Sequence, residues 1–385
     1  MRSLTLILTN RLYFGASWVF ASLNILIGTW AIYIPTVAEK LGLGEGALGV
    51  SLFFFALGTL ISIPMAPLII KQLGVGRVTI VSVVFFCVAA VFPLLASSHF
   101  LLSLALFMVG ATSGVTDIAM NTLVSEIESV KKVKIMSAAH GFFSLGGVIG
   151  AGIGSLLIAA IASPWIHMAM VAGVTLVVNL LLARYYINWR SATKEKTSFS
   201  FRSMRPLFAL GLISFIMMAS EGAVVDWSGL YLEKVTMAGS ALLIGMGYTV
   251  FSVTMTLGRF LGDQISHRLG SYPIIITGLI LGATAYLVIL TGNTMAAIIG
   301  FGILGLGFSV IIPELFRLGG NVSEMSAARG ISFIAGTGYA GFLTGPVVLG
   351  FLAQWSSLKT SYILLLGAAL FALVIAWYSR KQGNR

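Results

Sequence analysis

Long apolar runs alternate with short polar segments along almost the whole chain, and this alternation predicts the architecture. A helix needs roughly 20 apolar residues to cross a hydrocarbon core about 30 Å thick. Twelve runs have about that length, at 12–34, 47–70, 78–96, 100–125, 137–161, 164–187, 206–231, 241–262, 273–291, 294–317, 329–353 and 358–378. The sequence therefore predicts an all-α membrane protein with twelve transmembrane helices.

One polar segment is longer than the others and divides the chain into near-equal halves. Residues 188–205 read NWRSATKEKTSFSFRSMR. We expect a six-helix bundle over 1–187, a cytoplasmic linker over 188–205 and a second six-helix bundle over 206–385. The first apolar run is long enough to span and has no obvious small-residue cleavage site, so we expect no cleavable signal peptide.

Short matches between the halves predict an internal repeat. MSAAHG at 136–141 and MSAARG at 325–330 are 189 residues apart, and the LG pairs at 73–74 and 269–270 are 196 apart. Trp30 and Trp227 are 197 apart. The shared order and near-constant offset are what two pseudo-symmetric bundles in the same orientation would produce. Gly146, Gly150 and Gly154, four residues apart, predict close helix packing.

Charge agrees with a membrane protein rather than a soluble one. Of the 385 residues, 58% are hydrophobic and 9% charged, whereas soluble domains carry roughly 25% charged residues. The net charge of +11 lies in segments between apolar runs, so it indicates topology and not a nucleic-acid partner. Of the 23 Lys and Arg residues, all but Lys40, Lys234 and Lys359 fall on one side. Basic residues collect on the cytoplasmic side, which predicts cytoplasmic N and C termini in a bacterial inner membrane.

Four acids lie inside predicted spans, where an ionised side chain costs roughly 2.5–3.5 kcal/mol. They are Asp117, Glu221, Asp226 and Glu314. Each of them therefore needs a functional or structural reason for its position.

A polar stripe follows one face of the fourth predicted helix, because Ser113, Asp117, Asn121 and Ser125 recur every four residues. One interpretation is a pathway for solute or protons, and the other is a hydrogen-bonded seam between helices. His140, at the start of the fifth helix, is placed to meet Asn121 or Asp117. It is either a proton carrier or a structural hydrogen bonder.

The seventh helix carries a second stripe, in which Ser214, Glu221 and Ser228 are seven residues apart. We interpret Glu221 as facing a cavity and as a further candidate for proton coupling. Asp226 points about 140° away from Glu221 at 100° per residue, so we interpret it as structural. Asn24 is the counterpart of Glu221 in the first half.

Charged residues near the inner ends of the later helices predict ion pairs. Arg259 and Asp263 have i,i+4 spacing on the eighth helix, which allows a pair that acts as a conformational latch. Glu314 and Arg317 lie near the end of the tenth helix, and Arg329 begins the eleventh at similar depth. We expect Glu314 and Arg329 to hold these two helices together.

Several motifs occur in an order that resembles the major facilitator superfamily over essentially the whole chain. They are Asp117-Ile-Ala-Met-Asn121, Met136-Ser-Ala-Ala-His140-Gly141 with Ser144-Leu-Gly-Gly147, Glu221-Gly-Ala-Val-Val-Asp226-Trp227, and Gly258-Arg259-Phe-Leu-Gly262-Asp263. The nearer resemblance is to the MosC-like branch, which is related to the fucose-permease group. The resemblance implies alternating access, with a solute site between the halves near mid-membrane.

Polar and aromatic residues on the inner helices are the expected contacts of the solute. The substrate-binding candidates are Asn24, Trp30, Ser113, Asn121, Ser144 and Trp227. Aromatic faces pack on sugar rings and on organic cations, although such residues also form interfacial belts.

These observations favour a secondary transporter of a sugar, cyclitol or related polar metabolite, coupled to protons and active as a monomer. The alternative is a multidrug-type exporter of amphipathic compounds. A third class, a membrane enzyme or structural membrane protein, is disfavoured by the repeat. Two G-x-G-x-x-G matches lie in an outer loop and in an apolar span, and there is no Walker loop or zinc-type His/Cys cluster. We therefore expect no cofactor and no metal.

Overall fold

The computed structural model describes residues 2–43, 45–154, 161, 163–190, 205–239, 241–322 and 325–383. Helices joined by turns and loops make up these ranges, which contain no strand. Contacts divide the chain into two compact units. The N-terminal unit comprises Arg2–Glu195 and Met325–Ser332, and the C-terminal unit comprises Lys196–Glu324 and Phe333–Arg385. Of the expected linker, residues 191–204 lie outside the described residues.

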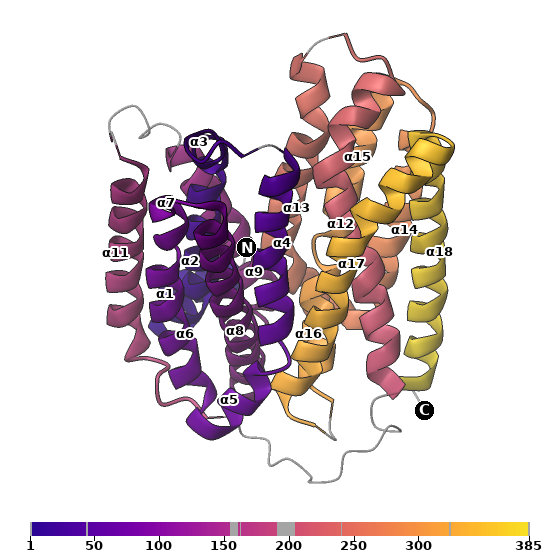
Figure 1. The fold of residues 1–385 in the computed structure, drawn as a ribbon. Helices are drawn as coiled ribbons and strands as arrows, with labels where there is room; N and C mark the ends of the chain where they lie inside the picture. The colour runs from indigo at the N-terminus through magenta and orange to yellow at the C-terminus, as the bar shows by residue number, and fades with distance from the viewer. Residues whose placement is uncertain are drawn as a thin grey trace. The chain divides into compact units, whose positions relative to one another are not determined.

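The N-terminal unit is built from helices that run back and forth along its length (Figure 1). They are α1 Arg2–Thr9, α2 Arg11–Ala31, α3 Ile34–Lys40, α4 Glu45–Ser62, α5 Ala66–Leu73, α6 Val75–Ala89, α7 Phe92–Leu95, α8 His99–Lys131, α9 Met136–Gly147, the π-helix η1 Val148–Ile153, and α11 Pro164–Ala183.

The C-terminal unit has longer and less interrupted helices (Figure 1). They are α12 Arg205–Lys234, α13 Ala241–Leu269, α14 Ser271–Ile289, α15 Thr294–Phe308, α16 Ile311–Gly320, α17 Ala327–Trp355 and α18 Leu358–Gly383. Of α17, the residues up to Ser332 are assigned to the N-terminal unit.

Each of the twelve predicted spans coincides with mainly helical chain over its described residues. Nine stretches are long and apolar enough to cross a membrane within the described part of the chain, and the bent pair α4 and α5 makes a tenth. The two remaining predicted spans coincide with α9 and η1 and with α13. The predicted all-α membrane fold is therefore confirmed, with ten of the twelve spans also meeting the length and hydropathy requirements.

Prolines explain why the second and third predicted spans are not single helices and why a separate short helix follows the first. Pro35, Pro67 and Pro93 stand in the first turns of α3, α5 and α7. Proline lacks an N–H and clashes with the preceding turn, so it starts a new helix more readily than it continues an old one. The axis bends by 49° between α4 and α5.

The sequence pattern missed α1, a short helix before the first span. Asn10 separates α1 from α2, and its side chain caps α2 by accepting hydrogen bonds from the backbone N–H groups of Leu12 and Tyr13 at 3.0 and 3.4 Å. This cap satisfies N–H groups that a helix start leaves unpaired.

Glycines bring helix backbones together in the same way in both units. A Cβ on Gly146 of α9 would collide with the carbonyl oxygen of Ala21 in α2, and one on Gly341 of α17 would collide with that of Phe215 in α12. These two contacts are equivalent under a shift of 194–195 residues. A second equivalent pair joins Gly110 to Phe55 and Gly305 to Phe251. The predicted repeat is thus present in the packing of the described helices as well as in the sequence.

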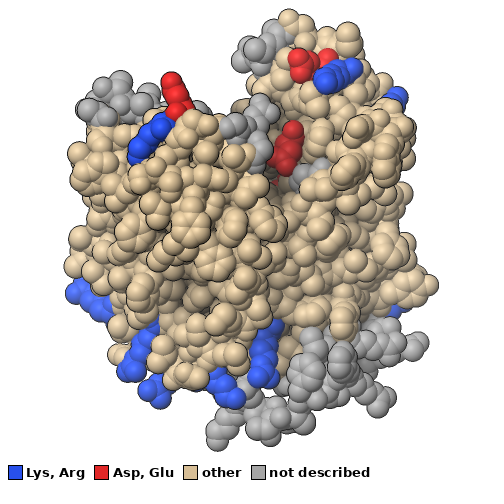
Figure 2. Space-filling model, in the orientation of Figure 1, with Lys and Arg blue, Asp and Glu red and all other residues tan. Residues whose placement is uncertain are grey.

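Basic side chains of the N-terminal unit collect at one set of helix ends. Arg11 begins α2, Lys71 lies in the last turn of α5, Arg77 lies in the first turn of α6, Lys131 ends α8 and Arg184 follows α11. Figure 2 shows blue basic side chains along the lower end of this unit. The basic residues lie at the starts of some helices and at the ends of others. Successive membrane-crossing helices produce this pattern when their basic segments share one side of the membrane.

Candidate functional site

The polar stripe of α8 continues into α9 through a chain of three buried side chains. Asn121 Nδ2 donates to Asp117 Oδ1 at 3.2 Å and to the Asp117 carbonyl oxygen at 2.8 Å. His140 Nε2 lies 3.0 Å from Asn121 Oδ1. Asp117 and His140 are each 8% exposed, and Asn121 is fully buried. The predicted meeting of His140 with Asn121 is therefore confirmed.

The amide of Asn121 fixes the direction of these bonds. A carboxylate only accepts, so the Asn121 Nδ2 group must face Asp117 and the Oδ1 atom must face His140. His140 then donates its Nε2–H. The imidazole packs edge-on against Phe20, with ring centroids 5.2 Å apart.

Ser113 of the same stripe has local structural partners. Ser113 Oγ donates to the Gly110 carbonyl oxygen at 2.9 Å and lies 3.5 Å from Thr59 Oγ1 on α4. Ser125 is buried. Ser113 thus belongs to the α4–α8 contact, while Asn121 bonds His140 on α9.

The other candidates of the N-terminal unit lie on α2 and α9. Asn24 Nδ2 donates to the Phe143 carbonyl oxygen at 3.0 Å, and Ser144 Oγ to the His140 carbonyl oxygen at 3.4 Å. Trp30 lines a small apolar pocket with Leu26, Phe55 and Phe86. Among these candidates, Asn24 directly links α2 to α9 and stands beside Gly147.

In the C-terminal unit, Glu221 on α12 forms an ion pair with Arg259 on α13. Arg259 Nη2 lies 3.9 Å from Glu221 Oε1, and the two side chains are 10% and 29% exposed, respectively. This distance is too long for a strong hydrogen bond. Asp226 is exposed, so the structure does not bring it together with Glu221.

The indole N–H of Trp227 is a candidate hydrogen-bond donor to a solute. Its Nε1 atom is buried without a hydrogen-bond partner among the described residues, and its ring packs against Gly350 of α17. A buried donor left unpaired costs free energy. This makes Trp227 the substrate-binding candidate with the clearest open polar group in its unit.

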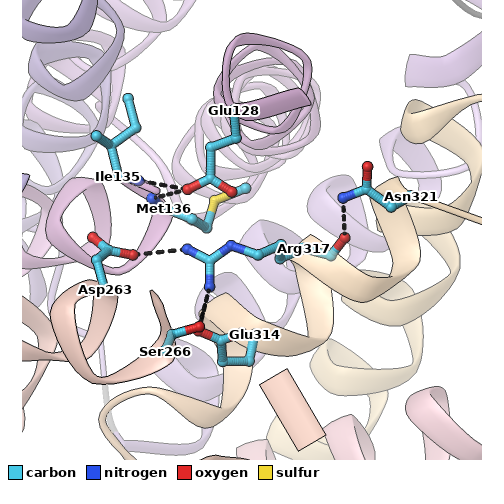
Figure 3. A network of polar contacts seen from close by, with 8 residues as sticks. All are labelled: Glu128, Ile135, Met136, Asp263, Ser266, Glu314, Arg317 and Asn321. Carbon is cyan, nitrogen blue, oxygen red and sulfur yellow. Dashed lines mark hydrogen bonds and ion pairs between the residues drawn. The ribbon is translucent and has the colours of Figure 1, made fainter. Parts of the chain in front are cut away.

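Arg317 joins a network near the ends of α13 and α16 (Figure 3). Its Nη2 donates to Asp263 Oδ1 at 2.7 Å, and its Nη1 donates to Ser266 Oγ at 3.1 Å and pairs with Glu314. The structure thus gives Arg259 and Asp263 partners on other helices, and the pair that i,i+4 spacing predicted between them stays a prediction. Arg329 belongs to the N-terminal unit, and its predicted pairing with Glu314 stays a prediction.

Three polar residues in the N-terminal unit were not singled out from the sequence. Glu128 Oε1 accepts from the backbone N–H groups of Ile135 and Met136, so it caps α9 (Figure 3). His167 Nδ1 lies 2.9 Å from the Tyr33 hydroxyl. Asn179 Nδ2 donates to Ser22 Oγ at 2.8 Å. A polar residue inside an apolar run was the available signal for His167 and Asn179.

The described residues contain no group of three or more His, Cys, Asp and Glu side chains arranged to hold a metal ion. The polar centres are instead one carboxylate–amide–imidazole chain and two carboxylate–guanidinium sites. A model of the family described as Major Facilitator Superfamily matches residues 12–322. The chain belongs to the major facilitator superfamily.

Individual relatives in this superfamily align with nearly the whole chain. An uncharacterized MFS-type transporter of Yersinia pestis is 33% identical over 361 residues, covering 91% of this chain and 92% of its own. Membrane protein MosC of Rhizobium meliloti is 27% identical and covers 94% and 89%, respectively. The resemblance to the MosC-like branch is therefore confirmed.

A solved structure of another transporter has the same fold as this chain. The transporter FucP, crystallised in its outward conformation, matches with a TM-score of 0.81 at 18% identity, covering 95% of this chain and 97% of FucP. FucP is the fucose:proton symporter of Escherichia coli. The chain is thus a multi-pass membrane transporter with the major facilitator fold.

Proposed function

We propose that this transporter moves a small polar organic solute, such as a sugar, cyclitol or related metabolite, across the bacterial inner membrane by alternating access and coupled to protons. The observation that carries the proposal is the Asp117–Asn121–His140 chain, which places two titratable groups inside the spans of α8 and α9. Polar residues at such depth are costly, so they mark solute or ion pathways more often than lipid-facing surfaces.

Asp117 is the proposed proton carrier. Its carboxylate is buried and its described side-chain partner is the neutral Asn121 amide, so a bound proton would remove an uncompensated charge. Asn121 has no titratable proton. It therefore holds Asp117 and His140 at a fixed separation without passing a proton between them.

Coupling follows if solute affinity differs between the two protonation states of Asp117. His140 supplies a second titratable group whose charge acts on the same solute-binding region. In the C-terminal unit, the long Glu221–Arg259 pair is the next candidate, because protonation of Glu221 would release Arg259 from a weak partner.

The proposed solute contacts are the candidates that the sequence indicated in each unit. The N-terminal candidates are Asn24, Trp30, Ser113, Asn121 and Ser144, and the C-terminal candidate is Trp227 with its open indole N–H. Similarity to FucP, a fucose:proton symporter, supports a polar solute and proton coupling at the level of the fold.

A ligand screen tests the substrate class. Purified protein is heated with sugars, cyclitols, amino sugars and amphipathic dyes, and a bound ligand raises the unfolding temperature according to RT ln(1+[L]/Kd). The protein is then reconstituted in liposomes, and uptake of the hit is followed with and without a protonophore. Stabilisation by polar solutes and protonophore-sensitive accumulation support the proposal, whereas stabilisation by dyes alone indicates the multidrug alternative.

Orientation needs a separate experiment. The basic residues at one set of helix ends favour cytoplasmic N and C termini and a cytoplasmic linker. Reporter fusions at Lys196 and Arg385 should be active with a cytoplasmic reporter and silent with a periplasmic one. Periplasmic activity at either position would overturn the proposed topology.

A further inference from the structure

Two arginines of the N-terminal unit converge on one tyrosine past the end of a membrane span. Arg11 begins α2, Arg184 follows α11, and Tyr185 is the next residue. The guanidinium carbons lie 5.8 Å and 4.8 Å from the centroid of the Tyr185 ring, and Arg11 Nη1 donates to the Tyr185 hydroxyl at 2.8 Å. The site thus draws together two segments that are 174 residues apart.

Neither arginine has a carboxylate within ion-pair distance among the described residues. Two like charges that share one ring are separated by no more than about one Debye length, which is roughly 10 Å at 0.1 M salt. They therefore repel each other, and the ring face and hydroxyl offset this only in part. A bound anion between them would remove the repulsion.

The Tyr185 hydroxyl reports the same positive field. α11 ends at Ala183, so the ring lies outside the span. The hydrogen bond from Arg11, aided by Arg184, lowers the pKa of Tyr185. A group that favours negative charge at its own position indicates a site that also favours an external anion.

The surroundings fit a membrane surface. Further exposed arginines, Arg77 and Arg190, stand on adjoining segments, since the Gly76 N–H donates to the Trp189 carbonyl oxygen at 3.0 Å. Helix α1 packs on α2 beside Arg11 with Ile7 buried and Leu8 exposed. Short amphipathic helices with neighbouring basic residues lie in the headgroup region of bilayers.

We propose that Arg11, Arg184 and Tyr185 bind the phosphate of an anionic phospholipid. Guanidinium groups offer forked N–H donors that match phosphate oxygens, and the phenol sits where interfacial tyrosines meet headgroups. Basic pockets between transmembrane helices bind phospholipid headgroups by this chemistry. The bound lipid would connect the start of α2 to the end of α11, and so stabilise the N-terminal unit.

The proposal is tested on the full chain in nanodiscs of phosphatidylcholine alone or mixed with phosphatidylglycerol. Phosphatidylglycerol should raise the unfolding temperature of the wild type. The double variant Arg11→Gln/Arg184→Gln should lose at least half of that rise, and Tyr185→Phe a smaller part. The matched control Arg380→Gln/Lys381→Gln removes two basic residues from the end of α18, where Lys381 Nζ lies 3.5 Å from the Trp377 ring centroid, and should keep the rise.

Two further arms identify the source of the phosphate. Inorganic phosphate and glycerol 3-phosphate, added to phosphatidylcholine nanodiscs, should give little of the rise, and equal stabilisation by either would assign the site to a free anion. Equal loss in the control variant would show a general charge effect and overturn the proposal, as would a full rise in the double variant. If the double variant does not fold, the single variants are compared with Arg380→Gln, and each should lose part of the rise.

Discussion

His140 Nε2 lies 3.0 Å from Asn121 Oδ1, so a buried imidazole and a buried amide hold each other in one orientation. Replacing Asn121 by Leu removes the amide and leaves both Asp117 and His140 without it. The loss of a buried hydrogen-bond partner costs about 1–3 kcal/mol, so thermal unfolding should occur at lower temperature and the pH profile of uptake should change.

Asn179→Leu is the matched control for that change. Asn179 is equally buried and donates to Ser22 and to the Thr175 carbonyl oxygen. It should also lower stability, while the pH profile of uptake stays that of the wild type. A pH profile altered to the same degree in both variants would assign Asn121 a purely structural role.

Asp117→Asn separates exchange from accumulation. Asn keeps the shape and much of the hydrogen bonding of Asp117 but cannot take up and release a proton. We expect solute binding and counterflow to persist in proteoliposomes, and accumulation driven by a pH gradient to be lost. Thr122→Val, on the same helix and with its hydroxyl bonded to the Ile118 carbonyl oxygen, should accumulate solute normally. Normal accumulation by Asp117→Asn would move the coupling site, with Glu221 the next residue to test.

Double-mutant cycles on Glu314 distinguish its two possible partners. Glu314 pairs with Arg317 in the C-terminal unit, and residues in one network couple by about 0.5–3 kcal/mol. The double neutral variant Glu314→Gln/Arg317→Gln should therefore lose less unfolding free energy than the two single variants lose together. We expect non-additivity for Glu314 and Arg329 too, in at least one conformational state; strict additivity with and without solute would exclude that pair.

Glycine substitutions test the repeated helix contacts. Gly146→Ala places a methyl group against the Ala21 carbonyl oxygen, and overpacking of this kind costs about 1–3 kcal/mol. Gly173→Ala on α11 meets nothing within 4 Å and should be neutral or stabilising by up to ~1 kcal/mol, because Ala favours helix more than Gly does. Gly341→Ala should resemble Gly146→Ala. Equal stability of Gly146→Ala and Gly173→Ala in thermal unfolding would contradict the tight contact.

Apolar length and spacing were enough to predict the helices and the polar stripe of α8. The positions of the helices could be predicted because a segment that crosses lipid must pair its backbone N–H and C=O groups within itself, which a helix does. The breaks at Pro35, Pro67 and Pro93 did not follow, since a run of apolar residues has the same length whether the helix within it is straight or bent. Helix α1 was missed because its apolar segment is too short to span.

Partners across helices were harder to predict than neighbours along one helix. Arg317 lies 54 residues from Asp263 in sequence and bonds it at 2.7 Å, a contact that the i,i+4 spacing of Arg259 and Asp263 did not indicate. Such a contact depends on how α13 and α16 pack, which periodicity does not encode. His140 was placed correctly near Asn121 because adjacent helices joined by a short loop are usually neighbours in space.

The matched glycine contacts also determine how late in synthesis α2 and α12 can pack against their partners. Ala21 meets Gly146, and Phe215 meets Gly341, so each contact waits for about 125 further residues to be added. At roughly 5–20 residues per second, α2 and α12 each spend on the order of 6–25 s in the translocon or bilayer before their glycine-bearing partners are synthesised. A ribosome pause within either interval would prolong the time for which these helices depend on lipid, or on an insertase, to cover them.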